Sequence, residues 1–189
     1  MRTVTRVIGV AVLTLASVRV TGAQSVDGID TFNANVAAYV ALHHQVERFL
    51  PPQQNYVDPE EGLAYAAALR RALCAVRSNA REDDIFGPAA GELRRRARYA
   101  LRAHAIEVRD LLLEMRDDTE DGARIPVVNE AFSWALGNLM PVAILDAMPP
   151  LPDELQYGLV GNSLVLVDIH AGLVVDILRN ALGVETTIQ

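Results

Sequence analysis

Apolar residues recur at helical spacing along most of the chain. From Asp30 to Leu50 they follow one another at steps of three and four residues, which marks one face of an amphipathic helix. Two prolines, Pro51 and Pro52, end that stretch. A second helix is predicted from Asp58, a good N-cap residue that is followed by a proline and two glutamates. The third periodic stretch, residues 88–117, would form a helix about 45 Å long if it were continuous.

The remaining third of the chain follows a different pattern. Prolines divide residues 124–152 into short pieces, with helices predicted over 129–139 and 141–147. Three runs rich in β-branched residues then follow, at 155–160, 163–169 and 173–178. Gly161 and Asn162 form a two-residue hairpin turn between the first two runs. A three-stranded meander is too small to be stable alone, so it must pack on the helices or pair with another chain.

The pattern predicts a mainly α fold: an antiparallel helical bundle with a small C-terminal three-stranded antiparallel β-meander. The bundle should cover residues 24–152 and the meander residues 153–182, with a tail at 183–189. His104 falls in the apolar stripe of the third helix, where we expect a buried ring with a hydrogen-bond partner. Cys74 is the only cysteine, and we expect it to be a small buried side chain in an alanine-rich helix.

The first 23 residues are typical of a secretory signal peptide. Arg2 and Arg6 precede an apolar run from Val7 to Val18, and Ala23 is a small residue suited to the cleavage site. Twelve residues of helix span about 18 Å, so an uncleaved membrane anchor is the weaker alternative. We expect a protein that is secreted or periplasmic after cleavage, with no transmembrane segment in the mature chain.

Composition narrows the function classes. The 189 residues are 51% hydrophobic, and all 17 basic residues are arginine. Without lysine there is no lysine-based catalysis. Loss of the signal peptide would remove three arginines and no acid, changing the formal charge from -7 to -10. Such a charge argues against a nucleic-acid partner, and the sequence contains no dinucleotide fingerprint, phosphate-binding loop or nucleophile elbow.

Two segments carry a resemblance to known proteins. One is the C-terminal stretch that begins with Pro149-Pro150-Leu151-Pro152 and continues through Tyr157, Leu164-Val165-Leu166 and Asp168 to Leu173-Val174-Val175-Asp176; the other is residues 81–88, Arg-Glu-Asp-Asp-Ile-Phe-Gly-Pro. Together they resemble a group of uncharacterised secreted bacterial proteins, to which no activity is attached. The strand unit alone is also similar to the C-terminal part of periplasmic nickel and cobalt homeostasis proteins, and that resemblance implies metal handling.

The candidate metal ligands are His43, Glu47 and His170. His43 and Glu47 are four residues apart and share a helix face. The adjacent His44 is rotated by about 100°, so we expect it to lie in solvent and not to share the site easily. Two ligands do not make a zinc site, which needs at least three from the protein. The others would have to come from His170, Asp168 or His104.

The second candidate is an arginine patch. Arg95, Arg98, Arg102 and Arg109 lie opposite the apolar stripe of the predicted third helix. They form either a solvated face paired with acids of this chain, such as Glu60, Glu61, Glu82, Asp83 and Asp84, or a site for an anionic ligand, lipid head group or envelope polymer.

Two functions follow. The leading prediction is a secreted or periplasmic, non-enzymatic helical protein with an interaction or structural role in the cell envelope. Its partner would be a protein or another envelope component, and no catalytic residue or organic cofactor is assigned. The alternative is a periplasmic metal-binding or metal-stress protein that uses His43 and Glu47 with His170, and a divalent metal is then the one cofactor expected.

Overall fold

The computed structural model describes residues 23–52, 58–117, 124–132 and 140–183. The helices and strands, in chain order, are α1 (Ala23–Glu47), α2 (Pro59–Val76), the short 3-10 helix η1 (Gly87–Ala89), α3 (Ala90–Ala103), α4 (Val108–Asp117), α5 (Val142–Ala147), β1 (Leu155–Val160), β2 (Ser163–Asp168) and β3 (Leu173–Leu178). The predicted mainly α fold with a C-terminal three-stranded antiparallel meander is therefore confirmed.

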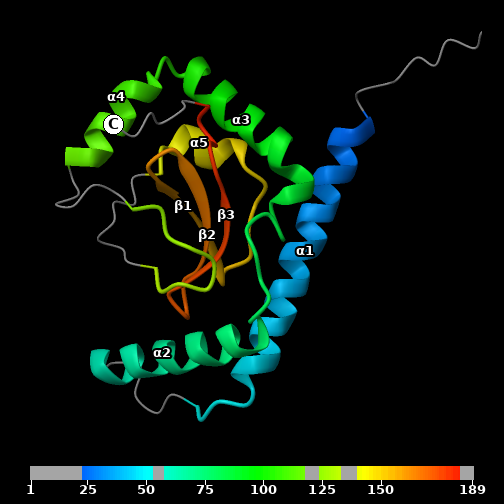
Figure 1. The fold of residues 1–189 in the computed structure, drawn as a ribbon, viewed down its shortest axis with the longest axis vertical. Coiled ribbons are helices and arrows are strands. Elements are labelled where there is room, and N and C mark those ends of the chain that lie inside the picture. The colour runs from blue at the N-terminus through cyan, green and yellow to red at the C-terminus, as the bar shows by residue number, and fades with distance from the viewer. Residues whose placement is uncertain (1–22, 53–57, 118–123, 133–139, 184–189) are drawn as a thin grey trace, which may run out of the picture.

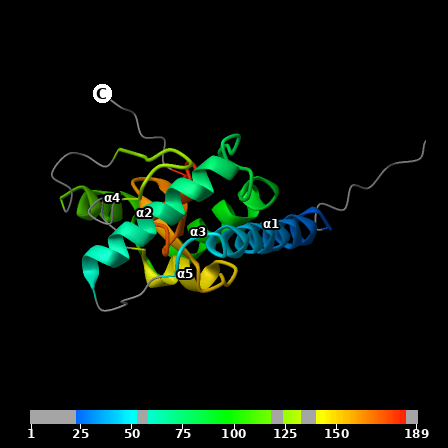
Figure 2. The same cartoon turned by 90° about the horizontal axis from the view of Figure 1, so that it is seen from below.

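The meander lies at the centre of the molecule. Its strands are hydrogen-bonded in the order β1-β2-β3, and every residue of β2 and β3 is buried. The helices surround the sheet, with α3 and α5 at one end, α2 at the other and α1 along one side (Figure 1; Figure 2). A sheet that is covered on both faces explains why its strands read as nearly continuous apolar runs.

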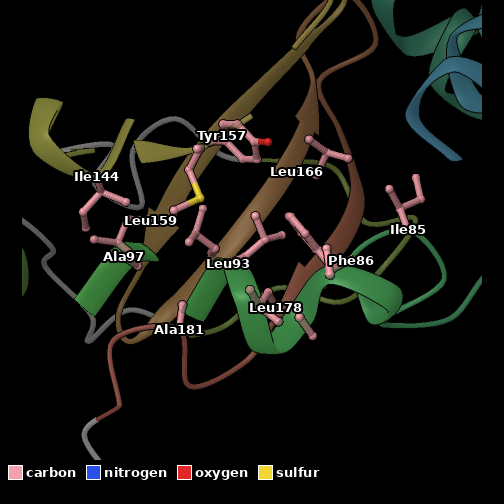
Figure 3. Close-up of a cluster of buried hydrophobic side chains, with 14 of the residues drawn as sticks. Ile85, Phe86, Leu93, Ala97, Ile144, Tyr157, Leu159, Leu166, Leu178 and Ala181 are labelled. Atoms are coloured by element: carbon pink, nitrogen blue, oxygen red, sulfur yellow. The ribbon is translucent and has the colours of Figure 1, made fainter. Parts of the chain in front are cut away.

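The largest core cluster joins one face of the sheet to α3, η1 and α5. Leu93 and Ala97 of α3 meet Leu159, Leu166 and Leu178 of the three strands (Figure 3). Phe32 of α1 stacks on Phe86, with ring centroids 5.8 Å apart. Close approach of α1 to η1 requires Gly28, because a Cβ atom there would lie 2.4 Å from the carbonyl oxygen of Pro88.

Two smaller clusters complete the interior. Phe132 covers the other face of the sheet, over Val165, Val167 and Ile177. The third cluster joins Leu69 and Leu73 of α2 to Val46 of α1 and to the β2–β3 turn, with Ala171 and Leu173. The turn between β2 and β3 is thus packed between α1 and α2.

A buried carboxylate ties the segment before η1 to the sheet. Asp176 of β3 is fully buried and accepts backbone N–H bonds of 2.7–2.8 Å from Asp83, Ile85, Phe86 and Ile177. Four donors satisfy a carboxylate that would otherwise be costly to bury. This contact fixes the 83–86 segment, part of one of the two stretches on which the family resemblance rests.

The predicted long helix over 88–117 is wrong in its middle. The chain leaves helical geometry after Ala103, and Ala105 takes a positive φ of 53° before α4 begins at Val108. His104 is the C-cap residue of α3 and is exposed, so the expected buried histidine is also wrong. Leu101 and Leu111, on either side of the break, both pack in the same core cluster. The spacing of apolar residues in the sequence therefore shows no interruption at the break.

Of the other predicted helices, the start of α2 and the position of α5 are confirmed, whereas the helix over 129–139 is not confirmed at its start. Asp58 caps α2 by accepting from the N–H of Glu60 at 2.9 Å, and α5 forms within the predicted 141–147. The helix predicted over 129–139 does not begin at Asn129: that residue has a positive φ of 67°, and Ala131 pairs with Leu173 as an isolated bridge. Residues 133–139 lie outside the described part.

Cys74 is half-buried rather than buried, and its thiol donates to the carbonyl oxygen of Asn129 at 3.3 Å. The predicted signal peptide falls on residues 1–22, outside the described part, and on Ala23, the first residue of α1. Among the helices of the described residues, none has both the length and the apolar character needed to cross a membrane.

Candidate functional site

The last two turns of α1 bring three polar side chains to the edge of the core. His43 belongs to the buried stripe that also contains Phe32, Val36 and Tyr39, and it is completely buried. His44 and Glu47 follow at the boundary with solvent, where their side chains are 51% and 37% exposed. Because this end of α1 lies beside the β2–β3 turn, the helix places its polar residues against the end of strand β2.

Asp168, the last residue of β2, holds His43 in place. One carboxylate oxygen, Oδ2, accepts from His43 Nδ1 at 2.6 Å and from the Tyr39 hydroxyl at 2.7 Å. The other, Oδ1, accepts from the backbone N–H of Ala171 at 2.8 Å. Asp168 is fully buried, as is His43. Since Nδ1 donates to Asp168, the neutral imidazole carries its lone pair on Nε2.

This network shifts the pKa of each member. Burial raises the pKa of Asp168, but hydrogen bonds from His43, Ala171 and Tyr39 outweigh it and hold that pKa below its usual value. Burial lowers the pKa of His43, yet the bond to Asp168 and the negative charges of Asp168, Glu47 and Glu154 raise it overall. The pKa of Tyr39 is strongly raised by burial and by Asp168, so its hydroxyl stays protonated as a donor. The site therefore stabilises positive charge on His43.

The second ring nitrogen of His43, Nε2, makes no hydrogen bond within the part of the chain that the structure describes. This nitrogen is buried and lies 3.9 Å from Oε2 of Glu47. Buried polar atoms are normally hydrogen-bonded, so an unsatisfied one in this position calls for an explanation.

His44 and Glu47 are held by carboxylate and phenol groups in a similar way. His44 Nε2 pairs with Glu154 at 2.8 Å, which leaves Nδ1 toward Glu47 Oε2 at 3.5 Å. The second oxygen of Glu47, Oε1, accepts from the Tyr65 hydroxyl of α2 at 3.2 Å. Each of the three side chains thus has one polar atom bound to a supporting group and one polar atom turned toward the other two.

Potential metal-ligand atoms of His43, His44 and Glu47 form a compact group. One ligand atom from each of His43, His44 and Glu47 lies within 4.8 Å of the other two. Two ligands of a tetrahedral zinc ion, each at about 2.0–2.1 Å, are about 3.3 Å apart. His44 is exposed, as expected, but the expectation that it cannot easily share the site is wrong: although rotated around the helix, it is three residues from Glu47, and its Nδ1 lies 3.5 Å from that carboxylate.

The other candidate ligands divide into two groups. His170, in the β2–β3 turn, is exposed and has its ring centroid 5.6 Å from that of His43. Asp168 is close as well, but it bonds to His43 instead of facing Glu47. His104 contributes nothing here, since it caps α3. The helix spacing identified His43 and Glu47; no sequence signal placed Glu154 or Tyr65 beside them.

The predicted arginine patch is divided between two helices. Arg95, Arg98 and Arg102 are on α3 and Arg109 is on α4, beyond the break, and all four are exposed. Arg95 pairs with Glu92 of its own helix, not with the acids expected. Of those acids, Glu82 pairs instead with Arg179, at 2.5 Å. Arg98 and Arg102 line a cleft of about 380 Å³ at the α3–α4 junction, with Ile106, Val108 and Leu182 among the other lining residues.

Searches of family models, curated proteins and solved structures all found no match to this chain. The resemblance to uncharacterised secreted proteins, and to nickel and cobalt homeostasis proteins, therefore stays a prediction from the sequence.

Proposed function

We propose that this chain is a secreted or periplasmic protein that binds a divalent transition-metal ion through His43, His44 and Glu47. The ligand atoms would be Nε2 of His43, Nδ1 of His44 and Oε2 of Glu47. The observation that carries the proposal is the buried Nε2 of His43, which makes no hydrogen bond with any described residue and lies 3.9 Å from the carboxylate of Glu47. A metal ion would supply the partner that this nitrogen lacks.

The groups behind the ligands support the proposal. Histidines that bind metal ions usually donate their other ring N–H to a carboxylate or carbonyl, which fixes the tautomer and makes the ligand more basic. Both histidines have such a carboxylate, Asp168 for His43 and Glu154 for His44. Tyr65 restrains Glu47 in the same way.

The electrostatics favour a cation. Three carboxylates, those of Glu47, Asp168 and Glu154, raise the pKa of His43, which means that positive charge on this ring is stabilised. A divalent ion at Nε2 would take the place of the proton and would be stabilised by the same three negative charges. Two imidazoles and one carboxylate form a ligand set suited to zinc and to iron, cobalt or nickel, and less to magnesium or calcium. The exposure of His44 and Glu47 leaves a route from solvent.

Calorimetric titration with Zn²⁺, Ni²⁺, Co²⁺ and Cu²⁺ tests the proposal. We expect one saturable ion per chain in the wild type and a loss of at least tenfold in affinity for His44→Ala, whose side chain is exposed enough for the fold to tolerate its removal. His104→Ala is the matched control, because His104 is an exposed histidine on another helix. Absence of saturable heat in the wild type would refute metal binding.

The interaction or structural role predicted from the sequence stays a prediction. Nothing among the described residues specifies a partner for it, whereas the His43 group specifies a ligand chemistry. The two roles are compatible, since an envelope protein can bind a metal ion.

A further inference from the structure

The turn between β2 and β3 brings a third histidine to the same group. Asp168 begins this turn and accepts from the N–H of Ala171, while Arg70 of α2 donates to the carbonyl oxygen of Ala171 at 2.9 Å. The turn is therefore anchored on both sides. His170 projects from it into solvent, and its ring contacts the ring of His43.

The ring separations from His43 to each of the other two histidines are close to those of histidines that share one ion. With metal–nitrogen bonds of about 2.0–2.1 Å and an imidazole radius of about 1.1 Å, two histidines on a tetrahedral ion have centroids about 5 Å apart. The His43–His44 centroid distance is 5.3 Å, and the His43–His170 distance is 5.6 Å. The ligand atoms that already lie within 4.8 Å of one another belong to His43, His44 and Glu47, so His170 would join them only after a rotation of its exposed side chain.

We propose that His170 is the fourth ligand, which closes a tetrahedral site of three histidines and Glu47 and makes the bound ion a clasp between α1 and the β2–β3 turn. This inference rests on the proposed function. Four protein ligands leave no open position for water, the arrangement of structural rather than catalytic zinc sites. A tetrahedral site of this kind favours Zn²⁺, because the filled d shell of this ion imposes no other coordination geometry.

The ligands come from distant parts of the chain. His43, His44 and Glu47 belong to α1, whereas His170 lies between two strands of the meander. A site built from α1 alone would leave the contact between helix and turn unchanged on loading. A site that includes His170 links the two, so the bound ion should stabilise the whole fold against unfolding.

Cobalt substitution distinguishes the two arrangements. Four-coordinate Co²⁺ absorbs visible light strongly, whereas five- and six-coordinate Co²⁺ absorbs weakly. We expect the intense spectrum in wild-type protein and its loss in His170→Ala, together with at least a tenfold loss of Zn²⁺ affinity and a smaller rise in melting temperature on Zn²⁺ addition. His104→Ala should behave as wild type. Because His170 is exposed, His170→Ala should melt as wild type does without metal.

The outcomes separate the two proposals. If His170→Ala binds Zn²⁺ as tightly as wild type and keeps the Co²⁺ spectrum, His170 is not a ligand and only this inference is overturned. A weak spectrum in the wild type, with saturable binding retained, overturns it as well and leaves a three-ligand site. Failure of the wild type to bind either ion refutes both proposals.

Discussion

The imidazole of His43 and the carboxylate of Asp168 lie 2.6 Å apart although 125 residues separate them in the sequence, and both are completely buried. This contact joins the end of α1 to the end of β2. It also decides which nitrogen of His43 faces the other polar residues. Metal binding at Nε2 depends on that orientation.

Asp168→Asn should weaken metal binding because an amide neither carries the charge nor accepts as strongly from His43. Loss of such a supporting group typically lowers metal affinity by about 10–100-fold. Asp176→Asn is the matched control: this carboxylate, on the neighbouring strand β3, is equally buried and accepts four backbone N–H bonds, but it lies outside the metal group. Both variants should unfold more easily, and only Asp168→Asn should lose affinity in a Zn²⁺ competition assay. Equal affinity for the two variants would contradict the role of Asp168.

On acidification, metal affinity should begin to fall at an unusually high pH. The ion and a proton compete for Nε2 of His43, and the pKa of this ring lies above its usual value of 6.5, despite burial, because of Asp168, Glu47 and Glu154. The charged or titratable groups around it are Tyr39, His44, Glu47, Glu154, Asp168 and His170. Below the pKa, apparent affinity should drop about tenfold per pH unit for this proton alone.

The sign of the shift can be tested with Asp168→Asn. Without that charge and hydrogen bond, the pKa of His43 should fall, so the acid loss of binding should begin at lower pH than in wild type. Zn²⁺ titrations between pH 5 and about 9 would show this. Identical pH profiles for the two proteins would mean that protonation of His43 does not govern binding.

Gly28→Ala should destabilise the fold, because its new Cβ would meet the carbonyl oxygen of Pro88 at 2.4 Å and force α1 away from η1. We expect a loss of about 1–3 kcal/mol, as for other overpacked sites. Gly91→Ala is the control on α3, where a Cβ meets nothing within 4 Å and should add up to about 1 kcal/mol through helix propensity. Urea unfolding of both variants measures the difference. Equal stability of the two would show that α1 and η1 are not in close contact.

The sequence predicted the elements better than their arrangement. Hairpin residues such as Gly161 and Asn162 and the capping residue Asp58 act locally, so the strands and the start of α2 were predictable. The break at Ala105 was not, because the apolar period continues through it and the positive φ is adopted by a residue with no turn preference.

The candidate site was predictable to the same local extent. His43 and Glu47 are four apart on one helix, and the period alone brings them together. Asp168, Glu154 and Tyr65 reach the site through tertiary packing of β2, the segment before β1, and α2, and one sequence carries no signal for such contacts. His44 was wrongly left out of the site, because the rotation of a residue about the helix axis does not fix the direction in which its side chain extends.

Two-bond ¹H–¹⁵N spectra of the histidine rings during a Zn²⁺ titration test the central claim most directly. One equivalent of Zn²⁺ should move the Nε2 resonance of His43 and the Nδ1 resonance of His44 to metal-bound positions. Nδ1 of His43 should keep the proton that it donates to Asp168, and the His104 signals should not shift. Saturation with Zn²⁺ that leaves both nitrogens of His43 unchanged would contradict the account.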